Sequence, residues 1–200
     1  LGENNKLQLG DKSYETNRDW RPVFFSQKGE VKPTEVVFAG YGMVVPEEPG
    51  QAEYDSYVHL DVKDKWVLAF RQMPQDIPAE RRQQLARYSD LRFKAMVARD
   101  RGAKGLIVVS GPTSQARQQL VPLTMDGTLG TSSLAVVSVT DDIASEWFKM
   151  ADLDLSKVQK GLDTGEMAMG YTLPKIKLAA NIDVQPVKSR GRNVLAILPA

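Results

Sequence analysis

Residues 93–110, FKAMVARDRGAKGLIVVS, combine a helix and a strand with almost no connection between them. Leu91, Ala95 and Ala98 recur at helical spacing, and Gly102 ends the helix one turn later. The small side chains on this face allow the helix to approach a sheet closely. The LIVV run near the end has no polar alternation, which is typical of a strand buried on both faces. We therefore expect this helix–strand unit to lie at the centre of the fold.

The rest of the chain supplies further strands and short helices around this unit. Apolar or alternating runs predict strands at 23–25, 35–39, 43–45, 66–70, 134–139, 176–184 and 194–198. Helical patterns cover 79–101 in two pieces, with Ser89-Asp90 as the cap of the second, and then 141–150 and 155–162. About seven or eight strands with three or four short helices predict an α/β or mixed α+β fold with a mixed sheet or open barrel. The strongly marked helix before Gly102 argues against an all-β sandwich.

Composition excludes several classes of function. The chain is 42% hydrophobic, and its 26 basic and 25 acidic residues give a net charge of +1, which provides no general attraction to nucleic acid or anionic membranes. No apolar run approaches the roughly 20 residues that cross a bilayer, and no signal peptide is recognisable after Leu1. The absence of cysteine excludes disulfides and thiolate metal sites but leaves the compartment open.

His59 is the single histidine of the chain. With one imidazole and no thiol, the sequence disfavours a zinc centre and cannot contain a zincin motif. His59 could act as a lone general base or a phosphate acceptor. Its place between Val58 and Leu60 favours the simpler interpretation, a surface or capping residue.

Other chemistry-bearing patterns have structural explanations. Gly40-Tyr-Gly42 lacks the third glycine of a dinucleotide motif and indicates a strand bulge with close backbone approach. The basic segment 188–192 is interpreted as a solvated hairpin turn. The scattered tryptophans indicate core positions: Trp20, Trp66 and Trp147. The acidic pairs indicate turns and helix caps: Asp61/Asp64, Asp141/Asp142 and Asp152/Asp154. The sequence therefore predicts no catalytic, cofactor-binding or metal residues, and leaves the binding residues unknown.

The order of four segments resembles a protease-associated (PA) domain. These segments are 36–42 (VVFAGYG), 54–67 (YDSYVHLDVKDKWV), 93–109 and 133–139 (SLAVVSV). The chain is most similar to the PA insert of M28-family zinc aminopeptidases, in which 192–198 (RNVLAIL) would be the strand that re-enters the catalytic domain. The usual "stable-and-proline" approach to the later strand is missing here.

This resemblance implies a swivelling β/β/α fold, an open barrel or sandwich, and a non-catalytic role. Residues 1–20 would be an irregular lead-in, and residues 21–200 a single PA-like domain. The resemblance places zinc in the catalytic domain of the same polypeptide, which would be the partner of this module, with peptide or protein substrates as further partners. Such modules are thought to gate substrate access or hold peptides, and the family implies export to the periplasm or the exterior.

Two alternatives come from other classes of protein. One is a free-standing swivelling-domain enzyme or phosphocarrier with His59 as the acceptor, which would require His59 beside a glycine and a helix N-terminus. The other is a flavodoxin-like domain that binds a small molecule at its strand ends.

Overall fold

The computed structural model describes residues 1–124, 130–166 and 169–185. These residues form ten strands: β1 (Lys6–Leu9), β2 (Lys12–Tyr14), β3 (Trp20–Pro22), β4 (Gly29–Phe38), β5 (Val44–Val45), β6 (Tyr54–Asp55), β7 (Trp66–Phe70), β8 (Gly105–Val109), β9 (Ala135–Val139) and β10 (Tyr171–Ile182). They also form four helices: α1 (Ala79–Ala86), α2 (Leu91–Asp100), α3 (Asp141–Met150) and α4 (Leu155–Asp163). None of these described helices is long and apolar enough to cross a membrane.

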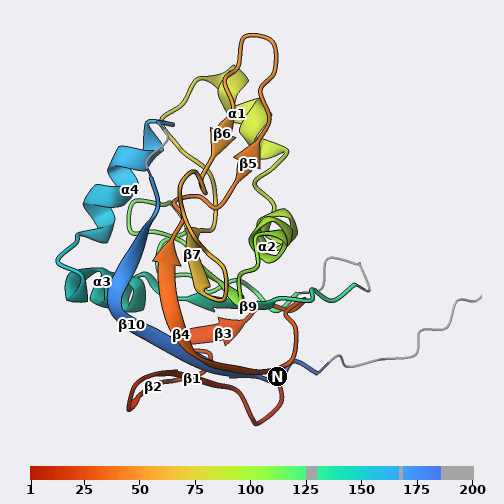
Figure 1. The fold of residues 1–200 in the computed structure, drawn as a ribbon, viewed down its shortest axis with the longest axis vertical. Coiled ribbons are helices and arrows are strands. Elements are labelled where there is room, and N and C mark those ends of the chain that lie inside the picture. The colour runs from red at the N-terminus through yellow and green to blue at the C-terminus, as the bar shows by residue number, and fades with distance from the viewer. Residues whose placement is uncertain (125–129, 167–168, 186–200) are drawn as a thin grey trace, which may run out of the picture.

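Eight of the strands form one mixed sheet in the order β2-β1-β10-β4-β7-β8-β9-β3. Neighbours within β4-β7-β8-β9 are parallel, and the remaining neighbours are antiparallel. The sheet curls strongly, and the long β10 sweeps around its side (Figure 1). Its two edge strands are consecutive in the chain, and the Trp20 indole N–H donates to the Tyr14 carbonyl across the turn between them, at 3.1 Å. The nearly closed sheet and the four helices confirm the predicted mixed α+β class and open-barrel shape.

Two apolar cores lie on opposite faces of this sheet. On one face α3 and α4 cover Val36, Leu68 and Ile107, and on the other α2 covers the alternate residues of the same strands (Figure 1). Ala95 and Ala98 of α2 are buried in the second core, which confirms the predicted close face of this helix. β7, β8 and β9 have no exposed residue, because helices cover both of their faces.

Several local predictions are confirmed at the level of single residues. Asp90 is the N-cap of α2 and accepts a hydrogen bond from the Arg92 amide at 2.8 Å, while Gly102 follows the helix with a φ of 82°. The helices predicted at 141–150 and 155–162 correspond to α3 and α4. All three tryptophans have no exposed surface.

The predicted irregular lead-in is wrong. Residues 6–9 and 12–14 form β1 and β2, and β1 pairs with β10 through register partners such as Leu7 and Ala180. Leu7 has no exposed surface, so this polar segment contributes one residue to the core. The pairing partner is more than 160 residues away, which local sequence patterns do not reveal.

Two further predictions need correction. Residues 23–25 are not a strand: β3 ends at Pro22, and Val23 and Phe25 pack into the second core from a turn. Gly40-Tyr-Gly42 is a tight turn rather than a bulge, with φ values of 51° and 62° at its glycines. The predicted close approach at this motif is confirmed, because a Cβ at Gly42 would lie 2.8 Å from the Ala69 Cβ. The predicted strand 194–198 and basic turn 188–192 lie outside the described residues.

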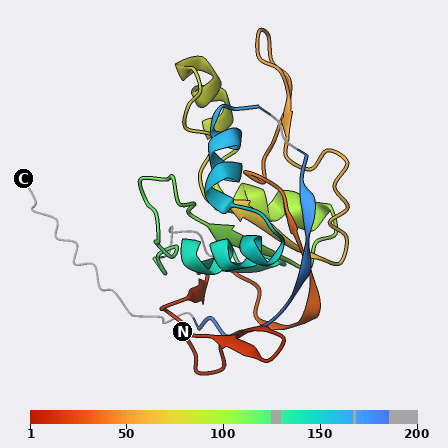
Figure 2. The ribbon, with the colours of Figure 1, turned by 90° about the vertical axis from the view of Figure 1, so that its left-hand side faces the viewer.

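The first and last parts of the described chain are hydrogen-bonded to each other. The Gly2 amide donates to the Asp183 carbonyl at 2.9 Å, and the Asp183 amide donates to the Asn5 side-chain oxygen at 2.8 Å. The Asn5 side-chain amide also donates to the Asp183 carbonyl, at 2.9 Å. Together with the pairing of β1 and β10, these bonds place residues 2–9 beside residues 178–183 (Figure 2).

Gly105 makes room for the buried Trp66 ring. A Cβ at this position would lie 2.1 Å from the Trp66 ring, whose N–H donates to the Leu178 carbonyl at 2.9 Å. Because the buried indole is held by this bond, we expect Gly105→Ala to lower the free energy of unfolding by about 1–3 kcal/mol. Urea denaturation measures the effect, with Gly161→Ala as the matched control.

The control glycine lies in α4, where an added Cβ meets nothing within 4 Å. Gly161→Ala should therefore be neutral or stabilise the protein by up to about 1 kcal/mol, since alanine is the better helix former. Equal stability of the Gly105→Ala protein and the wild type would show that the Trp66 ring can move aside.

Candidate functional site

The carboxyl ends of the four parallel strands open at one edge of the sheet, where open α/β sheets commonly bind ligands. The loops after β4, β7 and β8 and the start of α3 meet there. Buried polar side chains gather at this edge: Tyr41, Lys94, Ser114, Asp141, Gln159 and Asp163. Their hydrogen bonds decide which of them are available for chemistry.

Asp163, at the end of α4, connects three of these loops. Its carboxylate accepts hydrogen bonds from the Tyr41 hydroxyl at 2.5 Å, from the Gln75 amide at 3.1 Å and from the Thr113 hydroxyl at 3.1 Å. Burial, together with the bond to Asp163, raises the pKa of Tyr41 far above its ordinary value. Three donors on one buried carboxylate indicate a structural hub rather than a free general acid or base.

Asp141 and Gln159 fix the loop after β8. Asp141 accepts from the amides of Gly111, at 2.6 Å, and Gln118. Its pKa is raised because burial outweighs these two bonds. The Gln159 side chain accepts from the Thr113 amide at 2.9 Å and donates to the Ser114 hydroxyl at 3.1 Å. These bonds hold the loop against α3 and α4.

Lys94 is a lysine with no exposed surface, on the α2 face that packs into the second core. Its Nζ donates to the carbonyls of Phe70, Arg71 and Gln72, at 2.8, 3.2 and 2.5 Å. It also lies 5.9 Å from the centroid of the Tyr41 ring. Burial lowers the pKa of Lys94 to about 7, from 10.5. Lys94 therefore fixes the backbone that leaves β7.

A groove of about 460 Å³ opens beside this backbone. One wall is the loop after β7, with Arg71, Gln72, Met73 and Gln75, and the other is Arg82 of α1 with residues 89–91 at the start of α2. A larger hollow of about 690 Å³ lies at the opposite ends of the strands, beside the N-terminal half of β4. Its Lys104 and Asp64 are paired with each other at 2.9 Å, so we place the candidate site at the smaller groove.

The residues that the sequence singled out do not assemble a site. His59 lies exposed in the turn after β6, with a φ of 56°, and this turn contains no glycine and leads into no helix. Two of the acidic residues have the predicted local roles: Asp61 accepts from Lys65, and Asp154 caps α4 through the Ser156 and Lys157 amides. Asp64 lies in the predicted turn and pairs with Lys104. The predicted cap role of Asp141 is wrong, because its carboxylate accepts from the distant Gly111 and Gln118 amides instead. Within the described ranges, no three His, Cys, Asp or Glu side chains are grouped so that they could hold a metal ion.

Sequence reasoning missed Lys94, Arg71, Tyr41 and Asp163. Lys94 carried a usable signal: it lies one turn before Ala98, on the face of the helix that was predicted to touch the sheet. A lysine on such a face must be buried or displace the helix. Arg71 and Asp163 carried no comparable signal, because Arg71 follows β7 directly and Asp163 is the last residue of α4, and charged residues at the ends of elements are usually solvated.

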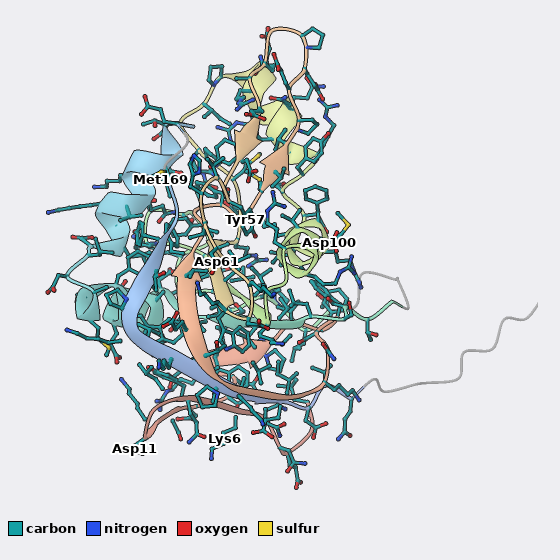
Figure 3. All side chains as sticks on the ribbon, viewed as in Figure 1. Lys6, Asp11, Tyr57, Asp61, Asp100 and Met169 are labelled. Carbon is teal, nitrogen blue, oxygen red and sulfur yellow. The ribbon has the colours of Figure 1, made fainter. Side chains whose placement is uncertain are left out.

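A shallow apolar pocket of about 210 Å³ lies between α4 and β10. It is lined by Phe38, Leu162 and Tyr171, and by Met169, which is 68% exposed and lies beside α4 (Figure 3). Among the described residues that line it, Lys157 is the only charged one, and it is exposed.

The sheet and its polar carboxyl edge define the chain as a mixed α+β domain with a strongly curved, nearly closed sheet. No protein-family model matches the chain, and no curated protein matches it. Among solved structures, it is similar to BSAP, a zinc aminopeptidase from Bacillus subtilis, with 14% identity and a TM-score of 0.43. The match covers 89% of this chain and 30% of that one. A likeness of this size carries no argument about function.

Proposed function

We propose that the chain is a non-catalytic, protease-associated module of an M28-like zinc aminopeptidase, which gates access to the catalytic domain or holds peptides for it. The observation that supports this most is the bonding of residues 2–5 to Asp183. Inserted domains join their host through adjacent connections, because separated ones would force the host apart. The order of the PA-like sequence motifs supports the same proposal.

The chemistry of the described residues is consistent with a binding role. The buried carboxylates are held by loop amides and hydroxyls, and the described side chains offer no metal cluster. The zinc of the proposed enzyme would belong to its catalytic domain, and export of the enzyme is part of the same proposal.

The test is excision of the module from the proposed enzyme. Residues 3–182 are replaced by a short Gly-Ser linker, and the hydrolysis of leucine p-nitroanilide and of a leucine-containing pentapeptide is compared before and after excision. We expect the small substrate to be hydrolysed as before and the KM of the pentapeptide to change several-fold. The 200-residue chain alone should hydrolyse neither substrate, with or without added zinc.

Three outcomes would contradict the proposal. One is chelator-sensitive aminopeptidase turnover by the pure 200-residue chain. Another is a coding sequence beyond Ala200 that lacks the His-x-Asp pair expected of such a peptidase. The third is unchanged kinetics for both substrates after excision, which would exclude gating and peptide holding together.

A further inference from the structure

Arg71 is a half-buried cation with no partner among the described residues. It follows β7 directly and borders the 460 Å³ groove, and no hydrogen bond or ion pair of its guanidinium is found within residues 1–124, 130–166 and 169–185. Burial lowers the pKa of Arg71 from its ordinary value. A desolvated guanidinium without a partner carries a free-energy cost, which a bound anion would offset through charge-assisted hydrogen bonds.

The backbone that carries Arg71 is held in place from the opposite side. The Arg71 amide donates to the Val109 carbonyl at 2.7 Å, and the Arg71 and Gln72 carbonyls accept from Lys94 Nζ. The Gln75 amide is bound to Asp163. The loop is therefore organised before any ligand arrives, which reduces the entropic cost of binding.

The rest of the groove suits a peptide. Met73 and Leu91 supply apolar surface, and the Gln72 side-chain amide has no hydrogen-bond partner among the described residues. An amide can both donate to and accept from a peptide backbone. A short peptide segment with one negative charge matches this lining. The lining offers two apolar side chains, together with the Arg71 guanidinium and the Gln72 amide, which have no partner among the described residues.

We propose that this groove binds a carboxylate group of a short peptide, with the Arg71 guanidinium as its anchor and the Gln72 amide on the adjoining backbone. This inference rests on the proposed function, because it assigns the site at which the module holds peptide. The carboxylate comes from the C-terminus of the peptide or from an acidic side chain.

The surroundings favour a carboxylate over a phosphate group. Arg82, the other cation of the groove, already donates to the Gln75 carbonyl. Asp90 borders the groove, and its carboxylate accepts from the Arg92 amide at 2.8 Å. A phosphate dianion would be repelled by this negative charge more strongly than a carboxylate, which pairs with one guanidinium through two parallel bonds.

The test measures fluorescence anisotropy with three N-terminally labelled pentapeptides. The first, Ala-Leu-Ala-Leu-Ala, has a free C-terminus. The second is the same peptide amidated, and the third is amidated with Glu in place of the fourth residue. We expect at least one carboxylate peptide to bind about 10-fold or more tightly than the neutral peptide, and the stronger of the two identifies the source of the carboxylate.

Variants of the full chain locate the binding. Arg71→Met keeps the apolar stem and should weaken binding of the carboxylate peptide about 10-fold or more, while Arg71→Lys should retain part of it. Arg87→Met is the matched control, because Arg87 lies beside α1, pairs with Glu48 at 2.7 Å and does not line the groove. Its affinity should equal that of the wild type. Thermal unfolding verifies that each variant is folded.

Equal affinity for the neutral and the carboxylate peptides would overturn the inference, and so would an unchanged affinity of Arg71→Met. Displacement of the peptide by inorganic phosphate at lower concentration than by acetate would overturn it in favour of a phosphate site. Failure of all three peptides to bind at millimolar concentration would also contradict the inference. The excision experiment tests the proposed function separately, because gating requires no peptide affinity of the module itself.

Discussion

Asp163→Ala is expected to lower the free energy of unfolding by about 3–5 kcal/mol. The substitution removes the single acceptor of three donors, the Tyr41 hydroxyl, the Gln75 amide and the Thr113 hydroxyl. Each donor left unsatisfied in a buried position costs roughly 1–3 kcal/mol, and bonds to a charged acceptor lie at the upper end of this range. Tyr41 is 1% exposed, so solvent cannot replace the lost acceptor there.

Two further variants separate the contributions to the stability loss of Asp163→Ala, and a third is a control. Tyr41→Phe removes one donor and should cost about 1–2 kcal/mol, and Asp163→Asn keeps one acceptor and should lie between Tyr41→Phe and Asp163→Ala. Asp11→Ala is the control, because Asp11 is exposed in the turn between β1 and β2, far from α4 (Figure 3), and should change stability by less than about 0.5 kcal/mol. Urea denaturation with an unchanged m-value measures all four. An Asp163→Ala protein within 1 kcal/mol of the wild type would show that this hub does not stabilise the edge.

The hub also matters for the groove. It fixes the loop that contains Gln75, while Lys94 fixes Arg71 and Gln72, so the groove wall is held at two places. Both holding groups approach from elements distant in sequence, α4 and α2. The strands thus determine where the site lies, and the buried side chains of Asp163 and Lys94 hold its wall in place.

The central strands were predictable because their signals are local. The runs at 66–70, 106–109 and 134–139 have no polar alternation, and in the structure helices cover both faces of β7, β8 and β9. α2 was predictable from its cap, its small face and its terminal glycine. β1 and β2 were not predictable, because β1 becomes a strand through its pairing with the distant β10, and β2 through its pairing with β1.

The candidate site was less predictable than the fold. A buried Lys94 could have been inferred from the helical face on which it lies, but its three carbonyl acceptors come from a loop whose path depends on the whole sheet. The lack of a partner for Arg71 among the described residues is a property of the three-dimensional arrangement alone. From the sequence, the single histidine and the lack of cysteine disfavoured a site built on these residues. His59 lies exposed in a turn, as the sequence had suggested.

The free energy of unfolding of the wild type is expected to rise between pH 7 and pH 10 relative to that of Lys94→Met, by roughly 2–4 kcal/mol. Burial lowers the pKa of Lys94 to about 7 in the folded chain, against 10.5 for an ordinary lysine. Between these values the unfolded chain holds more protons than the folded chain, so raising the pH favours the folded state. Below pH 7 both states are protonated, and the difference should become constant.

Comparison of the two proteins isolates Lys94 from the tyrosines. Burial raises the pKa of Tyr54 to about 12 and that of Tyr57 further, so their stabilising contribution is present below pH 10 and is lost as the pH rises above it. This loss occurs in both proteins and cancels in the difference. Urea denaturation at pH 6, 7, 8, 9 and 10 provides the curves, and Lys149→Met, at an exposed residue of α3, is the control that should show no such rise. A flat difference between the wild type and Lys94→Met from pH 7 to pH 10 would mean that the three carbonyls keep Lys94 protonated throughout, and that the backbone after β7 is held by a charged ammonium group.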